Sequence, residues 1–170
     1  MVWRTLNTIL VVLLVLLPVT AAAEVTQAVV SVEGMSCPFC AFGVEKKLKT
    51  VDGTSEVKVD MKGGTATLVA KDGKSLEIGQ IGQAVRTAGF TPGRLRITAI
   101  GVVKQENENL LLVVRNSSLT IHLLNLPLPL KQQLLALVKS GAVASLSGTV
   151  HEHVDDLPAM TPETVLEVTP

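Results

Sequence analysis

The period of the apolar residues alternates between that of a strand and that of a helix from residue 24 to residue 98, and this alternation constrains the fold more than any other feature. Within residues 26–32 every second residue is apolar, which is typical of a half-buried strand. After Gly34 the apolar residues recur every three or four positions, which indicates an amphipathic helix carrying Ala41, Val44 and Leu48 inward. Pro38 suits the first turn of this helix, because that turn needs no intrahelical bond from its N–H.

The same alternation repeats along the next forty or so residues. Apolar and polar residues alternate from 57 to 61, which places Met61 in the core, and a turn is expected at residues 62–64. A returning strand at residues 65–70 leads to a second helix, which Ser75 can cap and Gly89 ends.

A last strand begins near Arg94 and completes the order strand, helix, strand, strand, helix, strand. This order predicts an α+β, ferredoxin-like βαββαβ domain over residues 24–98, with two helices on one face of an antiparallel sheet.

Residues 99–170 are predicted to form a separate, small β-rich domain with one helix. The helix extends from near Pro129 to Gly141. Short strands are expected at residues 102–103, 110–114, 119–123, 143–150 and 165–168. Three strands, a helix and two more strands predict a small, partly open barrel that is OB-like, of the oligonucleotide-binding type. The strand that begins near Arg94 can run on into this unit, which leaves the position of the boundary open.

The first segment, residues 1–23, has the pattern of a secretory signal peptide. Arg4 precedes an uninterrupted apolar run at residues 9–17, and the small residues 21–23 fit a cleavage site. The run is shorter than the roughly 20 residues of a membrane-spanning helix. We therefore predict an exported, periplasmic protein whose mature chain starts at Glu24, with an uncleaved anchor as the alternative.

The charge balance argues against nucleic-acid partners. Fifteen Lys and Arg residues against fifteen Asp and Glu residues leave no global field that would hold DNA or an anionic membrane. Every Phe and Trp lies before residue 99, whereas single-strand binders need aromatic platforms on a basic groove. We expect no nucleic acid as partner, and a protein-contact or packing role for residues 99–170.

The cysteines carry the main functional signal. Cys37 and Cys40 are the two cysteines of the chain, and they lie where the first strand passes into the first helix. The free N–H groups and the dipole at a helix N-terminus favour the thiolate form. Two thiolates on one short loop suit a soft metal ion, Cu(I) or Hg(II), with Zn(II) also possible.

The motif Gly34-Met35-Ser36-Cys37-x-x-Cys40, followed by Val44-Glu45-x-x-Leu48, resembles the heavy-metal-associated (HMA) domain family. The later motif Ala88-Gly89-Phe90 also matches this family, which includes copper chaperones and the periplasmic mercuric-ion binding protein. The resemblance implies that Cys37 and Cys40 bind one metal ion, that Met35 packs under the loop, and that Phe90 shields the site. It further implies transfer of the metal to a metal-transporting membrane protein or another thiol metal carrier.

One departure from the family leaves two alternatives open. Pro38 and Phe39 stand between the cysteines, where the family more often has small or polar residues, and Cys-Pro-Phe-Cys also resembles the active site of glutaredoxin-like thiol-disulfide oxidoreductases. The antiparallel hairpin at residues 62–64 argues against that parallel-stranded fold. A structural disulfide is the other alternative. No Ser/His/Asp set, carboxylate-pair motif or phosphate loop is present, so we predict neither an enzyme nor a small-molecule substrate.

Three further features have simpler interpretations. The group His151, Glu152 and His153 could hold Zn(II) or Cu(II), but a solvated strand end is the favoured interpretation. His122 is expected to be a partly buried strand residue, and Met160 a loop residue. The exposed lysines of the first helix can steer an acidic partner, although a solvated helix face is the default: Lys46, Lys47 and Lys49.

Overall fold

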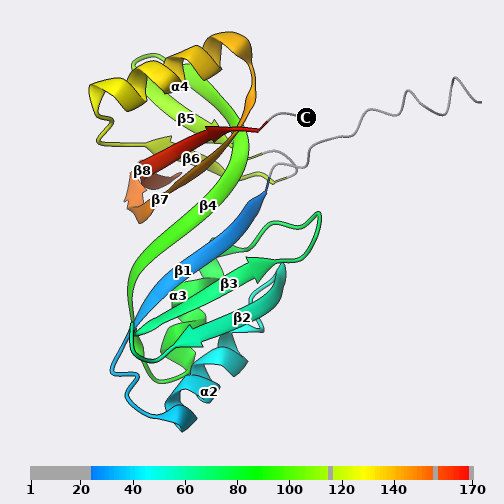
Figure 1. Ribbon diagram of the computed structural model, residues 1–170, viewed down its shortest axis with the longest axis vertical. Helices are drawn as coiled ribbons and strands as arrows, with labels where there is room; N and C mark the ends of the chain where they lie inside the picture. Colours follow the sequence, from blue (N-terminus) through cyan, green and yellow to red (C-terminus); the bar gives the residue numbers. More distant parts are fainter. Residues whose placement is uncertain (1–23, 115–116, 155–156, 169–170) are drawn as a thin grey trace, which may run out of the picture.

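The computed structural model describes residues 24–114, 117–154 and 157–168, and the predicted signal peptide lies outside the described residues. Within them the elements, labelled as in Figure 1, follow the chain from β1 to β8. Their bounds are β1 Val25–Glu33, α2 Pro38–Leu48, β2 Thr54–Asp60, β3 Thr65–Ala70, α3 Ile78–Thr87, β4 Thr91–Glu106, β5 Asn109–Val113, β6 Thr120–Leu123, α4 Leu128–Ser140, β7 Val143–Val154 and β8 Leu157–Glu167.

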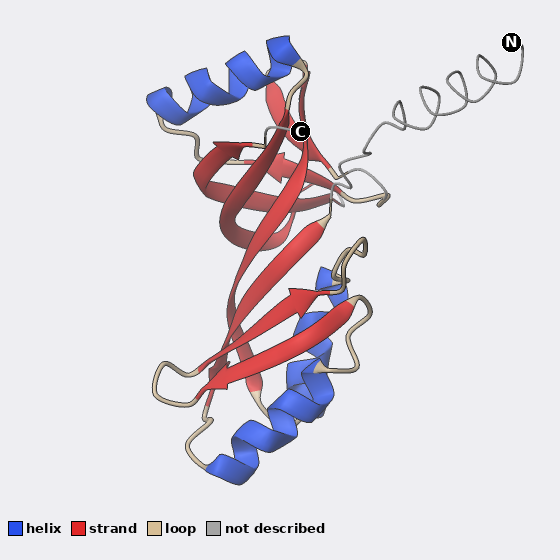
Figure 2. Ribbon diagram, turned by 45° about the vertical axis from the view of Figure 1, so that its right-hand side comes forward, coloured by secondary structure: helices blue, strands red, loops and turns tan. Residues whose placement is uncertain are grey.

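The first part of the chain has the predicted ferredoxin-like fold. Strands β2, β3, β1 and β4 lie side by side in that order, and each neighbouring pair is antiparallel. Helices α2 and α3 cover one face of this sheet (Figure 2). The covered face carries Ala28 and Val30 of β1, both buried against the helical residues Val44, Leu48 and Ile81.

Strand β4 is long enough to join the two parts of the molecule. It pairs with β1 through Thr91–Ala99 and with β7 through Leu95–Val102, and its last residues pair with β5. Gly101 lies where β4 passes from β1 to β5, and a Cβ atom there would be 2.5 Å from the carbonyl oxygen of Val113. The strand can follow this path because glycine has no side chain.

The second part is the β-rich unit that the sequence predicts. Strands β4, β5, β6, β8 and β7 pair in a ring, because β7 returns to β4. The pairs are antiparallel except for β6 and β8, which run parallel. Helix α4 connects β6 to β7 and lies against one end of the ring (Figure 1).

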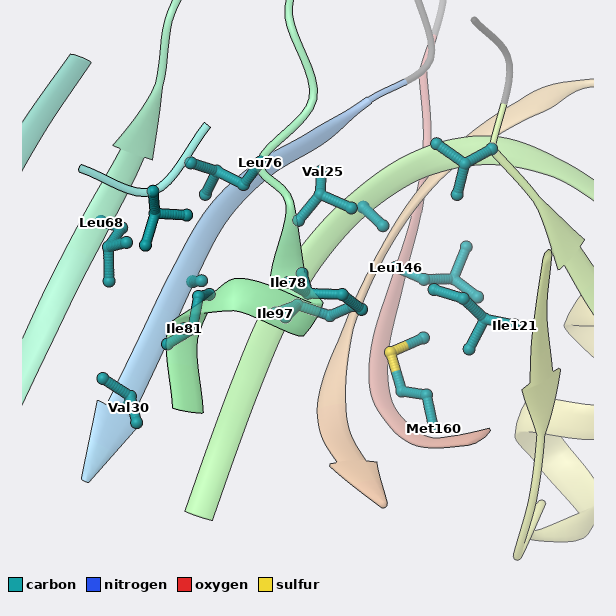
Figure 3. Packing of buried hydrophobic residues seen from close by; sticks show 14 of the residues in the cluster. Val25, Val30, Leu68, Leu76, Ile78, Ile81, Ile97, Ile121, Leu146 and Met160 are labelled. Atoms are coloured by element: carbon teal, nitrogen blue, oxygen red, sulfur yellow. The ribbon is translucent and has the colours of Figure 1, made fainter. Parts of the chain in front are cut away.

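The apolar core is continuous through both parts. One cluster of buried residues includes Val30, Leu68 and Ile81 from the first part and Ile121, Leu146 and Met160 from the second (Figure 3). Ile97 of β4 belongs to the same cluster. The boundary predicted at residue 98 falls inside β4, and the division of the chain into two domains at that point stays a prediction.

Three local predictions are wrong. Met61 is 44% exposed in the turn after β2, because the Asp60 carboxylate accepts a hydrogen bond from the N–H of Lys62 (2.9 Å) and ends the strand. Ser75 does not cap α3: its hydroxyl accepts from the N–H of Val25 (3.1 Å), and Glu77 is the cap. Met160 is fully buried in β8 rather than in a loop.

Candidate metal site

The cysteine loop connects β1 to α2 at the end of the ferredoxin-like unit that lies away from the ring (Figure 1). Gly34 turns the chain with a φ of 81°, a conformation that side chains disfavour. Cys37 then has extended backbone and is the N-cap of α2, and Pro38 begins the helix. The loop therefore delivers Cys37 to the positive end of the helix dipole, as the sequence predicts.

The two cysteines are held by the first turn of α2. The N–H of Cys40 donates to the sulfur of Cys37 (3.1 Å), and the N–H of Ala41 donates to the Cys37 carbonyl (3.0 Å). Their Cα atoms are 5.1 Å apart and their sulfurs are joined in a disulfide. This is the oxidised form of the pair, so binding of a metal by both sulfurs requires prior reduction.

The residues around the loop differ in how they face the solvent. Met35 is buried with 6% of its surface exposed and belongs to the core cluster, so its sulfur is not presented as a ligand. Cys40 and Phe90 are half-buried and pack against the same cluster. The shielding role that the resemblance implies for Phe90 stays a prediction.

Exposed apolar side chains gather at this end of the molecule. Phe39 is 89% exposed, Phe42 is 66% exposed, and the two lie one turn apart on α2. Met61 lies in the β2–β3 turn, which the bond from Val32 N–H to the Gly64 carbonyl (2.8 Å) places at the same end of the sheet. We call Phe39, Phe42 and Met61 the apolar tip. The sequence gives no sign of it, because a phenylalanine in the first turns of a helix can be either buried or exposed.

Charged groups near the loop lie in solvent. Lys46 and Lys47 are exposed on α2, and Lys49 forms an ion pair with Glu45 (2.6 Å). Such exposed pairs contribute little to stability.

Glu24 precedes β1, at the end of the sheet opposite the cysteines. Burial of its carboxyl group, and then the negative charge of Asp72, raise the pKa of Glu24.

The histidines lie in the ring, apart from the cysteine loop. His122 is half-buried in β6, as predicted, and His151 is exposed in β7 with its Nε2 2.8 Å from the hydroxyl oxygen of Thr161. The side chains of Glu152 and His153 lie outside the described residues. Among the side chains that are described, no group of three or more His, Cys, Asp or Glu residues is placed to hold a metal ion.

Comparison with known proteins identifies the unit that carries the cysteines. The heavy-metal-associated domain model matches residues 29–91. The copper chaperone CopZ of Staphylococcus aureus (strain MRSA252) is 31% identical over 65 residues, which are 38% of this chain and 94% of CopZ. The chain belongs to the heavy-metal-associated domain family. The family match contains both cysteines and ends at residue 91, at the start of β4.

Solved structures similar to the heavy-metal-associated domain include a CopZ metallochaperone and MerP. A structure described as the CopZ metallochaperone is 28% identical with a TM-score of 0.37, covering 40% of this chain and all of that chain (100%). The crystal structure of oxidized MerP from Ralstonia metallidurans CH34 is 28% identical with a TM-score of 0.35, covering 42% of this chain and 96% of MerP. Over the part of the chain that the structure describes, no helix has the length and apolarity needed to cross a membrane.

Proposed function

We propose that the mature chain is a periplasmic soft-metal carrier or scavenger that binds one Cu(I) or Hg(II) ion through Cys37 and Cys40 and passes it to a partner. The observation that carries this proposal is a cysteine pair on the first turn of α2, with Cys37 as its N-cap, inside a heavy-metal-associated domain. Export rests on the signal pattern of residues 1–23.

The chemistry begins with the reduction of the disulfide. An external dithiol supplies two electrons and two protons, leaves as a disulfide, and gives two thiols on α2. Each thiol loses its proton when its sulfur binds the metal. Two thiolates suit Cu(I) and Hg(II), whereas structural Zn(II) sites use four ligands, so Zn(II) is the weaker candidate. No catalysis is required.

Release proceeds by exchange of one sulfur at a time. A thiolate of the partner binds the ion while Cys37 or Cys40 leaves, so the ion is never free in solution. A metal-transporting membrane protein or another thiol metal carrier provides such a thiolate. The partner is a protein that meets the cysteine loop directly.

The apolar tip is where we propose that this partner docks. Phe39 and Phe42 lie beside the cysteines and expose most of their surface, and exposed apolar side chains that gather at one site mark contact surfaces. Lys46 and Lys47 on the same helix add positive charge, which suits an acidic rim on the partner.

For the ring we propose the OB-like barrel type. Its strands pair in the order β4-β5-β6-β8-β7 and close on β4. Its helix α4 stands between β6 and β7, the third and fourth of these strands along the chain, as in a five-stranded Greek-key barrel. Residues 99–170 have four Lys and Arg against seven Asp and Glu, and no Phe or Trp, which disfavours a nucleic-acid role.

A glutaredoxin-like thiol-disulfide oxidoreductase is the second candidate, and the Cys37–Cys40 disulfide favours it. The two functions separate in one assay. An oxidoreductase reduces a small mixed disulfide with turnover when a reductant is supplied, whereas a metal carrier does not turn over.

The decisive experiment is titration of the reduced mature protein with Cu(I), Hg(II) and Zn(II) under exclusion of oxygen. We expect one ion per chain, with Cys37→Ser and Cys40→Ser each lowering the affinity by at least about 100-fold, because two-sulfur binding becomes one-sulfur binding. Ser36→Ala is the matched control, since Ser36 is exposed on the same loop and carries no sulfur. Tight binding of the metal in both cysteine variants would show that Cys37 and Cys40 are not the metal site.

A further inference from the structure

Strand register brings two histidines to one place on the ring. His122 of β6 pairs with Ala159 of β8, and His151 of β7 pairs with the same Ala159 from its other side. The three neighbouring strands therefore carry a row that reads histidine, alanine, histidine. The two histidines are 29 positions apart in the sequence, so their spacing gives no sign of this arrangement.

The row lies on the outside of the ring. The next register row contains Leu123, Met160 and Val150, and its first two members are buried in the core cluster. Because successive side chains of a strand point to opposite faces, the row of His122, Ala159 and His151 points away from the core.

Ala159 is covered although it faces outward. It has no exposed surface, yet it does not belong to the continuous core cluster. Its row neighbours His122 and His151 are only half-buried and exposed, respectively. The Cα atoms of the two histidines are about 10 Å apart, two strand spacings, with a single methyl group between them. Two imidazoles, each with a metal–nitrogen distance of about 2 Å, can bind the same ion across this distance.

A hydrogen-bond pair orients one of the rings. His151 Nε2 is 2.8 Å from the Thr161 hydroxyl, and the side-chain amide of Asn125 donates to the same hydroxyl oxygen (3.3 Å). With Nε2–H donating to Thr161, the lone pair of His151 lies on Nδ1. Metal-binding histidines are commonly fixed in this way, with the second ring nitrogen bonded to an oxygen atom.

We propose that His122 and His151 bind one divalent first-row metal ion over Ala159, on the outside of the ring. Imidazole nitrogens suit Cu(II), Ni(II) and Zn(II), and Cu(II) binds most tightly among these ions. Water completes the coordination. This site is chemically distinct from the thiolate pair, and it does not depend on the function proposed for Cys37 and Cys40.

The test uses the untagged mature protein in its disulfide-bonded form, in which the sulfurs are blocked. Cu(II) is added, its affinity is measured against a competing chelator, and the electron paramagnetic resonance spectrum is examined for coupling to two nitrogen nuclei. His122→Gln and His151→Gln are each expected to lower the affinity by about tenfold or more and to remove one nitrogen from the coupling pattern. His153→Gln is the matched control and is expected to keep the affinity of the parent protein.

Two results would overturn the site. One is that the parent protein does not bind Cu(II), or that His122→Gln binds Cu(II) as tightly as the parent. The other is loss of binding in His151→Gln and His153→Gln with His122→Gln intact, which would assign the ion to the end of β7 instead.

A further variant tests the geometry without removing a ligand. Thr161→Val deletes the hydroxyl that orients His151, and we expect a drop in Cu(II) affinity between about 10- and 100-fold with two nitrogens still coupled. An unchanged affinity in a variant whose thermal melting matches that of the parent would show that His151 does not bind in the inferred orientation.

Discussion

Cys37 and Cys40 have different surroundings although they are three residues apart. The sulfur of Cys37 accepts a hydrogen bond from the N–H of Cys40 at the helix N-terminus, whereas Cys40 packs against the core cluster. A thiolate that accepts an N–H bond at the positive end of a helix dipole is stabilised, and an apolar environment disfavours the charged form. In the reduced protein we therefore expect Cys37 to be the more reactive of the two sulfurs.

This difference predicts the order of alkylation in the reduced protein. With less than one equivalent of iodoacetamide at neutral pH, we expect Cys37 to be modified several-fold faster than Cys40, as measured by mass spectrometry of the peptides. The unfolded protein is the control, because both thiols should then react alike. Preferential modification of Cys40 in the folded protein would contradict the assignment.

At the scale of single elements, the sequence predicts most strands and helices, because each half-buried element repeats its own apolar period. The sequence pattern fails where a local hydrogen bond or an irregularity in strand pairing determines where a strand ends or continues. Met61 continues the alternation of β2, but the Asp60 side chain ends the strand before it. The prolines around Met160 suggest a loop, yet Pro162 lies within β8. It pairs with Gly148 of β7, next to an irregularity in the pairing between Ser147 and Gly148, and such irregularities tolerate proline in a strand.

In the candidate site, too, some features could be predicted from the sequence and others could not. The cysteine pair and its place at a helix start could be read from the motif, because a contiguous segment carries them. The apolar tip and the His122–Ala159–His151 row could not, since the first joins a helix to a distant turn and the second depends on pairing between strands far apart in sequence.

The apolar tip gives a prediction for element α2. The variant Phe39→Ser/Phe42→Ser should keep Cu(I) affinity and thermal stability, because both side chains are exposed. Transfer of Cu(I) to a thiol acceptor domain should slow by about tenfold or more, since large apolar anchors dominate protein contacts. Stopped-flow transfer kinetics measure this. Leu166→Ser is the matched control, because Leu166 is 68% exposed but lies on the ring, and equal slowing in both variants would refute docking at the tip.

The passage of β4 from one part to the other depends on Gly101. We expect Gly101→Ala to lower the free energy of unfolding by about 1–3 kcal/mol, because its Cβ meets backbone atoms of Val113 that cannot move aside freely. Urea denaturation measures the change. Gly43→Ala is the control: nothing lies within 4 Å of a Cβ there, and alanine in a helix is favoured by up to about 1 kcal/mol. Equal effects at the two glycines would contradict the close approach at β4.

At the scale of the whole molecule, β4 joins the sheet of the heavy-metal-associated domain to the ring, so that the edge of this sheet at β4 is no longer open. Alone, a sheet in the order β2-β3-β1-β4 has two open edges, at β2 and β4. Here β7 pairs with β4 over eight register positions from Leu95 to Val102, so that edge is closed. Helix α2 and the cysteine loop that precedes it lie at the end of the molecule away from the ring (Figure 1).

Because one cluster of buried side chains continues from Val30 to Met160, loss of either part exposes apolar surface of the other. We therefore expect the mature, disulfide-bonded protein to unfold in a single cooperative transition, with a calorimetric enthalpy equal to the van't Hoff enthalpy. Gly101→Ala should lower the melting temperature of this one transition rather than split it. Two separate transitions in differential scanning calorimetry, one of them insensitive to Gly101→Ala, would show that the parts fold independently and that β4 merely links them.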